Sequence, residues 1–342
     1  MRRRRFLAAL AACLATGARA AVPAPRTLVK PPRLRRGDLV GLAAPGGIMT
    51  DAEIERAVRN LEDFGLHVKF GDNIRLKRGN YAGQPFQQVE DLHAMFRDPE
   101  VKAIWGGRGG SGCMSLLPLL DYALIRKHPK VVVGFSDVTA LHLAIQRHAG
   151  LVTFHGPAAI STFSEYSTAN LRAVLEEPRP TLVIEGAEEN ARRAESAPQF
   201  ERGALRAGVA EGRLVGGNLA IVSALVGTPY AARMKGAIAF FEEVNEATYR
   251  IYRMLTQLVL SGDLKEACGV MLGVFTRSDV PAGDAALSLE ETLRDNLEPL
   301  RIPVGYGFSF GHISNQFTIP LGIRARLDAG AGTLTLLEPA VT

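Results

Sequence analysis

Short apolar runs and amphipathic segments alternate through the first half of the chain. Apolar residues recur at the spacing of one helix face in residues 52–65, 88–100, 114–129 and 137–150, and Asp51 precedes the first segment as a helix cap. The runs between them have strand length and read "GDLVGLAAPGG", "LHVKFG", "VKAIWG", "KVVVGF" and "LVTFHGPA". Alternating strands and helices predict an α/β domain with a parallel sheet and helices on both faces, which we place at residues 37–168.

The pattern changes after Thr168. Residues 169–205 are charged, alanine-rich and weakly periodic, which indicates a linker with an irregular connection. From residue 206 a strand joins a helix through a glycine pair in "GRLVGGNLAIVSALVG", and two further strands flank an amphipathic helix at 246–262. Residues 300–339 read as short strands and turns. We therefore predict a second, smaller α+β domain at 206–342 that is richer in strand towards its end.

Residues 1–20 have the three parts of an export signal. Arg2 to Arg5 form a basic start, "FLAALAACLA" is too short to span a bilayer as a helix, and Ala18-Arg19-Ala20 is a small-x-small cleavage site. "RRRFL" also fits a twin-arginine signal, so Sec and twin-arginine export both stay open. "LAAC" resembles a lipoprotein box at Cys13, but the apolar run continues past it, which disfavours a lipid anchor. We predict an exported, periplasmic protein.

The signal also carries the excess basic charge. The signal contains five arginines and no acidic residue, so it contributes five positive charges, and the formal net charge of the whole chain is +5. Its cleavage therefore leaves a mature chain without net charge. Such a chain lacks the basic excess that phosphate-backbone binding needs, which argues against a nucleic-acid partner. We predict no membrane span, no cofactor and no metal site, since neither the histidines nor Cys113 and Cys268 show ligand spacing. The two cysteines are expected as free thiols rather than as a disulfide.

Residues 107–112, "GRGGSG", satisfy the dinucleotide-binding pattern G-x-G-x-x-G between a strand and a helix. The first acid after them, Asp121, comes about half as far on as a ribose-binding acid should lie, which argues against a nicotinamide cofactor. A glycine-rich turn at a helix start still exposes N–H groups that stabilise an anion. That anion is a phosphate, a carboxylate or a tetrahedral oxyanion.

Ser136 stands between the apolar run "VVVGF" and the helical segment "DVTALH". Serine is a favoured helix N-cap, and Asp137 suits a first turn, so local chemistry favours a cap. A sharp strand-to-helix turn is also where a nucleophile is held, with Gly134 allowing tight packing and helix N–H groups facing an oxyanion. The full G-x-S-x-G pattern is absent, because Val138 occupies its last position.

A nucleophilic serine needs a base and a group that orients the base. His142 lies two turns along the same helix and is expected to pack, whereas His155, at a strand end, and His312, in a glycine-rich turn, stay open. Glu242 and Glu243 end an apolar strand, where adjacent side chains face opposite sides. In isolation this pair reads as a solvated strand end.

Together these segments resemble the LD-carboxypeptidases, a serine peptidase family that includes muramoyltetrapeptide carboxypeptidase and the microcin C immunity peptidases. The resemblance runs from about Gly37 to Pro339. The segments that carry it, in order, are "GDLVGLAAPGG", "YAGQPFQQVEDLHAMFRDPEVKAIWGGRGGSG", "PKVVVGFSDVTALHLAI", "TFHGP", "GRLVGGNLAIVSALVGTPY", "FFEEVNEATYRIYRMLTQL" and "PVGYGFSFGHISNQFTIPLG".

The resemblance implies roles for particular residues. The family's G-[YF]-S-D-x-T motif places its nucleophile at Ser136, its apolar-apolar-E-[DE] strand end places the catalytic glutamate at Glu242, and its G-[FY]-x-x-G-H motif places the histidine at His312. The implied oxyanion hole combines the backbone N–H of Asp137 with that of Gly109 or Gly110. The implied fold pairs a Rossmann-like N-terminal domain, similar to class I glutamine amidotransferases, with a smaller C-terminal domain. The active site would lie between them, commonly in a homodimer.

The expected activity is removal of the terminal D-alanine from peptidoglycan tetrapeptides, with Arg108 as the candidate for binding the substrate carboxylate. Bracing of the glycine turn is the alternative for Arg108. Two other functions stay open, a microcin C-type peptidyl-nucleotide hydrolase and a non-catalytic exported binding protein. The chain departs from the family pattern at three places, none of them in the implied triad: Ser111, Tyr252 and residues 46–47.

Overall fold

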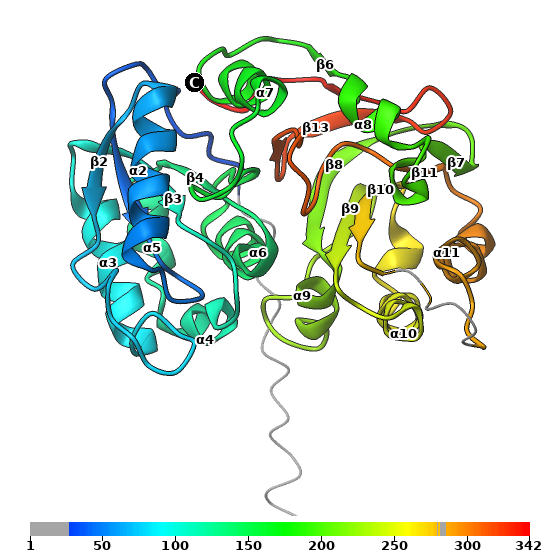
Figure 1. Cartoon of the computed structure of the whole chain (residues 1–342), viewed down its shortest axis with the longest axis horizontal. Helices are drawn as coiled ribbons and strands as arrows, with labels where there is room; N and C mark the ends of the chain where they lie inside the picture. The colour runs from blue at the N-terminus through cyan, green and yellow to red at the C-terminus, as the bar shows by residue number, and fades with distance from the viewer. Residues whose placement is uncertain (1–26, 279, 281–284) are drawn as a thin grey trace, which may run out of the picture.

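The computed structural model describes residues 27–278, 280 and 285–342, which form two α/β halves lying side by side (Figure 1). One half is built on a six-stranded sheet and the other on an eight-stranded sheet. The export signal at residues 1–20, with Cys13, lies outside the described residues.

The first sheet has the strand order β12-β5-β4-β3-β1-β2, and its five N-terminal strands are parallel, as predicted. Helices flank the sheet, and β4 is buried along its whole length, as expected for a covered parallel sheet. The elements are β1 (Leu39–Ala43), α2 (Asp51–Phe64), β2 (His67–Phe70), α3 (Pro85–Arg97), β3 (Val101–Gly106), α4 (Cys113–Leu116), α5 (Tyr122–Lys127), β4 (Val131–Gly134), α6 (Thr139–Ala149) and β5 (Phe154–His155).

Two helix predictions in this half need correction. The N-cap of α2 is Thr50, not Asp51, because the Thr50 side chain accepts from the Glu53 N–H and Glu53 in turn accepts from the Thr50 N–H. The segment 114–129 is two short helices separated by a 3₁₀ turn that contains Pro118, and Asp121 caps the second of them.

The second sheet has the order β6-β14-β13-β8-β9-β10-β11-β7. Strands β8 to β11 form a parallel centre, with antiparallel strands towards both edges. The glycine pair at 216–217 lies at the junction of β8 and α9, as predicted. The elements are β8 (Val209–Asn218), α9 (Leu219–Ala224), β9 (Ala237–Val244), α10 (Thr248–Leu260), β10 (Gly269–Thr276), α11 (Leu289–Leu297), β11 (Val304–Tyr306), β13 (Arg324–Asp328) and β14 (Thr333–Leu336).

The segment 169–205 is not an irregular linker. It contains the end of α7 (Glu165–Leu175), the strand β6 (Leu182–Ile184), the helix α8 (Glu188–Arg193) and all but the last residue of the strand β7 (Gly203–Arg206). Both edge strands of the second sheet come from it, since β6 pairs with β14 and β7 pairs with β11. Strands of three and four residues are too short to show a clear period in the sequence.

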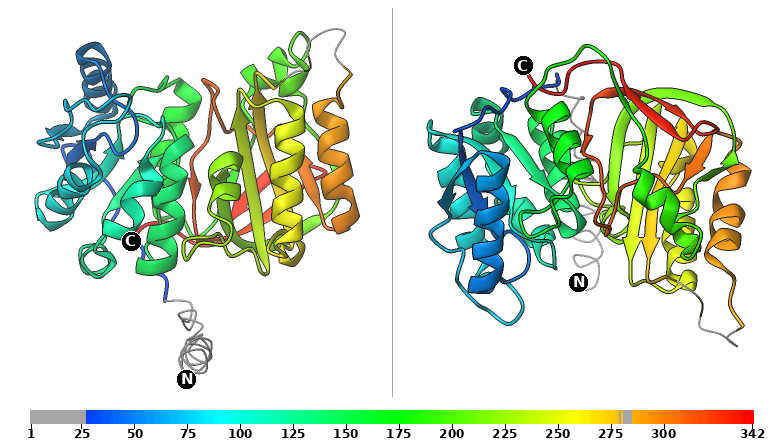
Figure 2. Two further views of the ribbon diagram at one scale, coloured as in Figure 1. Left: turned by 90° about the horizontal axis from the view of Figure 1, so that it is seen from below. Right: turned by 45° about the horizontal axis from the view of Figure 1, so that its top comes forward.

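The two halves share chain segments. Strand β12 (Ile319–Pro320), from the C-terminal part of the chain, pairs antiparallel with β5 in the first sheet. The last residue, Thr342, exchanges backbone hydrogen bonds of 2.9–3.0 Å with Pro31 and Arg33. Figure 2 shows the orange-to-red C-terminal segment between the halves, so the chain returns to the first half before it ends.

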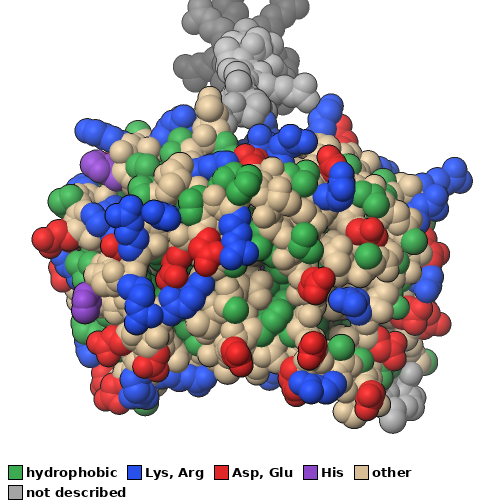
Figure 3. Space-filling model, turned by 90° about the horizontal axis from the view of Figure 1, so that it is seen from above, with side chains coloured by type: hydrophobic (Ala, Val, Ile, Leu, Met, Phe, Trp, Pro, Cys, Tyr) green, Lys and Arg blue, Asp and Glu red, His purple; other side chains and the backbone are tan. Residues whose placement is uncertain are grey.

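Acidic and basic side chains are interspersed over the face shown in Figure 3. Among the described residues, no helix combines the length and apolar character needed to cross a membrane.

Candidate active site

Ser136 lies on a sharp turn between β4 and α6. It begins a one-turn 3₁₀ helix (Ser136–Val138), and its φ of 60° falls in the left-handed region that residues other than glycine rarely adopt. The N-cap positions of this turn and of α6 are held by Phe135 and Val138, so the cap role that local chemistry favoured for Ser136 is absent. A side chain at Gly134 would lie 2.8 Å from Val138, which confirms the tight packing expected beneath this turn. Backbone strain of this kind is concentrated at functional sites.

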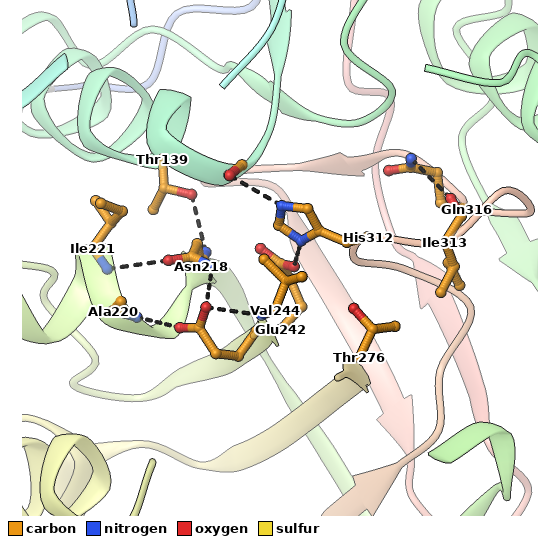
Figure 4. A network of polar contacts seen from close by, with 12 residues as sticks. Thr139, Asn218, Ala220, Ile221, Glu242, Val244, Thr276, His312, Ile313 and Gln316 are labelled. Atoms are coloured by element: carbon orange, nitrogen blue, oxygen red, sulfur yellow. Dashed lines mark hydrogen bonds and ion pairs between the residues drawn. The ribbon is translucent and has the colours of Figure 1, made fainter. Parts of the chain in front are cut away.

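His312 contacts both Ser136 and Glu242. Figure 4 shows the ring of His312 next to Glu242. The Nε2 atom of His312 lies 3.1 Å from the Ser136 Oγ, and its Nδ1 atom lies 2.7 Å from Oε2 of Glu242. Ser136 follows the carboxyl end of β4, whereas Glu242 lies near the carboxyl end of β9 and His312 follows β11. The structure therefore brings together three residues from segments far apart in sequence and from both halves.

Glycine makes the approach of His312 to Glu242 sterically feasible. Gly311 has a φ of 116°, and a Cβ atom there would lie 3.1 Å from the Cβ of Glu242. The same residue forms an isolated bridge with Val274 of β10, which fixes the loop that carries the histidine.

Glu242 and His312 each stabilise the charged form of the other. Burial alone would raise the pKa of Glu242, but the His312 charge and the hydrogen bond to it outweigh burial and hold this pKa below its usual value. Burial alone would lower the pKa of His312, but the Glu242 charge and hydrogen bond outweigh burial and raise it. The imidazole is thus well suited to accept a proton in this site.

The other two candidate histidines do not contact the Ser136 hydroxyl. His142 packs as predicted, with Nε2 2.8 Å from the Gly134 carbonyl oxygen, and burial lowers its pKa to about 3. His155 is fully buried and packs against aromatic rings, including that of Phe135.

The residues predicted for an oxyanion hole lie beside Ser136. A Cβ atom on Gly109 would be 2.8 Å from the Ser136 Cβ and 3.3 Å from the Asp137 backbone nitrogen. Gly110 has a φ of 110° and packs against Gly47. The Asp137 carboxylate points away to accept from the Cys113 N–H at 2.9 Å, and burial raises the pKa of this carboxyl group. The Asp137 side chain thus holds the glycine turn against the serine turn.

Arg108 is paired within the protein. Its Nη1 atom lies 2.9 Å from Oε1 of Glu53 and 3.3 Å from the Ile48 carbonyl oxygen. These contacts fit the alternative, an arginine that braces the glycine turn, and the role of Arg108 in binding a substrate carboxylate stays a prediction.

Sequence reasoning missed a buried network beside the triad. Glu243, like Glu242, is buried rather than solvated, and it faces the opposite side of the strand. Its carboxylate accepts from the Asn218 side chain at 3.0 Å and from the Ala220 N–H at 2.7 Å, and burial raises its pKa to about 7. The Thr139 hydroxyl of α6 accepts from the Asn218 N–H, which links the halves. The asparagine directly before the α9 segment was the available signal, since asparagine is a favoured N-cap.

A separate cavity of about 1030 Å³ lies between the halves at the far end of α6, lined by Arg147, Arg213 and Glu338 among others. Since α6 has 11 residues and therefore measures roughly 16 Å, this cavity is remote from Ser136 at the other end of the helix. Arg213 already contacts Glu338 and the Gly322 carbonyl oxygen.

Within the described part of the chain, no group of three or more His, Cys, Asp or Glu residues is arranged to hold a metal ion. Cys113 and Cys268 are free thiols, as predicted; Cys113 is buried and Cys268 is partly exposed.

A serine hydroxyl next to a histidine that is paired with a buried carboxylate defines the class of serine hydrolases. The N-terminal domain of the LD-carboxypeptidases matches residues 40–156, and the C-terminal domain of the same family matches residues 211–327. The chain belongs to the LD-carboxypeptidase family and is a serine carboxypeptidase.

Relatives of known name cover nearly the whole chain. A probable murein peptide carboxypeptidase of Bacillus subtilis is 36% identical over 90% of this chain and 94% of its own length. A murein tetrapeptide carboxypeptidase of Pseudomonas aeruginosa is 31% identical over 84% of this chain and 92% of its own length. The crystal structure of an MccF-like protein from Bacillus anthracis is 29% identical, with a TM-score of 0.79 over 90% of this chain and 99% of that one.

Proposed function

We propose that this protein is an LD-carboxypeptidase that removes the terminal D-alanine from peptidoglycan tetrapeptides, at the L,D bond after meso-diaminopimelate, in cell-wall turnover or recycling. The observation that carries the proposal is the contact of His312 with both Ser136 and Glu242. The names of the murein peptide relatives support the substrate class.

In the first half of the proposed reaction, Ser136 Oγ attacks the carbonyl carbon of diaminopimelate while His312 Nε2 takes the hydroxyl proton. Glu242 stabilises the imidazolium that forms. The oxyanion faces the N–H groups of Asp137 and of Gly109 or Gly110, and one such donor is typically worth about 3 kcal/mol. Collapse of the tetrahedral intermediate breaks the C–N bond, and His312 gives its proton to the departing D-alanine amine.

In the second half, the peptide is held as an ester on Ser136. His312 takes a proton from a water molecule, whose oxygen attacks the ester carbonyl. The second tetrahedral intermediate collapses, the C–O bond to serine breaks, and His312 returns the proton to Ser136 Oγ. The products are the tripeptide and free D-alanine, and the enzyme is regenerated.

The test compares wild type, Ser136→Ala and the control Ser115→Ala on a purified tetrapeptide, with mass spectrometry of the muropeptide and of released D-alanine. Ser115 is exposed, and among the described residues its hydroxyl donates only to the Gly112 carbonyl oxygen of its own turn, so the control should retain wild-type turnover. We expect Ser136→Ala to lose at least about 10³-fold in kcat. Turnover by Ser136→Ala at the wild-type rate would contradict the mechanism, and a tetrapeptide with an amidated D-alanine tests the need for a free carboxylate.

A second candidate function, hydrolysis of peptidyl-nucleotide compounds of the microcin C type, is favoured by the likeness to the MccF-like protein. Parallel assays with an aminoacyl-sulfamoyl adenosine distinguish the two. A higher kcat/KM for that compound than for the tetrapeptide would reassign the substrate. Failure of the protein to turn over either compound, with both bound, would favour the non-catalytic binding protein.

We also propose that the protein is exported to the periplasm and acts as a homodimer. N-terminal sequencing of the periplasmic fraction should begin at Ala21, and a mature chain that begins with acylated Cys13 would indicate a lipoprotein instead. Light scattering of the purified protein should give twice the chain mass, whereas a single chain mass would refute the dimer.

A further inference from the structure

His155 lies one layer beneath the catalytic residues. In the first sheet it is paired with Gly134, and its ring contacts those of Phe240 at 5.5 Å and Phe310 at 6.1 Å between centroids. Each of these neighbours precedes a proposed catalytic residue by two positions: Gly134 precedes Ser136, Phe240 precedes Glu242 and Phe310 precedes His312. Because strand side chains alternate, Phe240 and Glu242 lie on the same side of β9. His155 therefore contacts, in each of the three segments that carry the proposed catalytic residues, the residue two positions before the catalytic one. We call this layer of residues beneath the triad the floor of the site.

Two polar groups at this floor lack partners. The Oε2 atom of Glu242 bonds to His312, but Oε1 is buried with no hydrogen-bond partner among the described residues, although the nearby Asn218 side chain also helps to lower the pKa of this carboxyl group. The same holds for both ring nitrogens of His155. An unsatisfied buried carboxylate oxygen is costly, and so is an unsatisfied buried N–H. A donor and an acceptor buried beneath the same site are complementary.

His155 is a neutral imidazole at working pH. Burial lowers its pKa to about 4, although the charge of Glu242 acts in the opposite direction and His312 lowers it further. A neutral imidazole carries one N–H donor and one acceptor nitrogen.

We propose that His155 is a positioning residue for the reaction put forward above: it donates its N–H, through one buried water molecule, to Oε1 of Glu242. The water satisfies two groups that otherwise have no partner, which is the usual role of buried water. With both oxygens bonded, the Glu242 carboxylate has one orientation, and it holds His312 in line with Ser136. This inference rests on the proposed function, because it assigns His155 a part in the same proton transfer.

Loss of the His155 N–H donor should change the pKa of His312 in one direction. The charged groups that act on His312 are Glu242, Glu243 and Arg277. Without the N–H from His155, the Glu242 anion is less stabilised, so the Glu242–His312 pair holds its proton more tightly. The pKa of His312 then rises, and the fraction of neutral base at pH 7 falls.

The experiment compares His155→Phe, which fills the same aromatic surroundings without an N–H, with His155→Gln, which restores a donor. His67→Phe, at an exposed position on β2, is the control. NMR titration of His312 in the resting protein gives its pKa, and the pH profile of tetrapeptide hydrolysis gives kcat and KM.

We expect His155→Phe to raise the pKa of His312 by about half a unit. It should also lower kcat about tenfold with little change in KM, the size of effect seen for partners that orient a first ligand or base. His155→Gln should recover most of both effects, and the control should change neither. An unchanged His312 titration in His155→Phe, or equal impairment in a folded His155→Gln, would overturn the proposal.

If His155→Phe does not fold, His155→Leu against His155→Gln makes the same comparison. The NMR readout needs no substrate. If wild type cleaves no tetrapeptide, the proposed function fails while the His312 titration still decides the role of His155.

Discussion

At the scale of single residues, the site depends on the absence of a side chain at Gly109. A Cβ atom there would lie 2.8 Å from the Ser136 Cβ and 2.9 Å from its Oγ, so Gly109→Ala should displace the nucleophile and the oxyanion donors. We expect kcat to fall by about 10²–10³-fold with unchanged circular dichroism. Gly330→Ala is the matched control, since a Cβ there meets only ordinary contacts at 3.6 Å. Wild-type kinetics in a folded Gly109→Ala would contradict the proposed oxyanion hole.

The pH dependence tests the pairing of Glu242 with His312. The base must be neutral to accept a proton, and the Glu242 carboxylate raises the pKa of His312. The logarithm of kcat/KM should therefore fall with decreasing pH through a midpoint above 6.5. Glu242→Gln removes the charge, so the midpoint should move to lower pH while the plateau falls about 10³–10⁴-fold. A midpoint that does not move would show that another group controls the titration.

The sequence predicts a residue's role only when the residues that define that role lie in the same segment or in a recognisable family motif. The resemblance pointed to Ser136, Glu242 and His312, and the structure places them in contact. Local chemistry at Ser136 favoured a cap, because nothing within its own segment reveals a base 176 residues away. The place of His155 could not be predicted either, since its neighbours come from three other segments.

At the scale of elements, α11 illustrates a signal that was readable but missed. Ser288 and Glu291 form a capping box, with 2.8 Å between the Ser288 N–H and the Glu291 carboxylate. Ser288→Ala should cost about 1 kcal/mol of unfolding free energy, measured in urea, and leave kcat/KM unchanged because α11 contributes nothing to the triad. Ser196→Ala, at an exposed position with a weak 3.5 Å contact, should cost less than about 0.5 kcal/mol. Equal losses in the two variants would contradict the capping role.

The edge strands β6 and β7 show why an element can escape prediction. They contain three and four residues, and all of these except Arg206 fall in the charged segment 169–205. Their sequences, Leu-Val-Ile and Gly-Ala-Leu-Arg, are too short to show the alternation of apolar and polar residues that reveals a strand. Short edge strands also offer little backbone for pairing with other molecules. The buried parallel strands, such as β4 with its four buried residues, were predicted because helices cover both faces and require apolar side chains.

At the scale of the whole molecule, the site exists only when the halves are assembled. Ser136 belongs to the first half, and Glu242 and His312 belong to the second. Contacts across the boundary include Thr139 with Asn218 and the pairing of β12 with β5. The sequence pattern predicted the α/β class of the first half and a strand-rich α+β second half, whose sheet has a parallel centre with antiparallel strands towards both edges. The return of residues 319–320 to the first sheet did not, because a two-residue strand carries no period of its own.

This exchange of segments predicts cooperative unfolding of the whole chain. Proteins with two domains often unfold in separate transitions, but here the first sheet includes a strand from the C-terminal part, and Thr342 bonds to Pro31. Calorimetry should show one transition, with hydrolytic activity lost at the same temperature. Deletion of residues 340–342 should lower the midpoint of that transition without splitting it. Two resolved transitions in the intact chain would mean that each half is stable alone, and that the shared strand contributes little to holding Ser136 against His312.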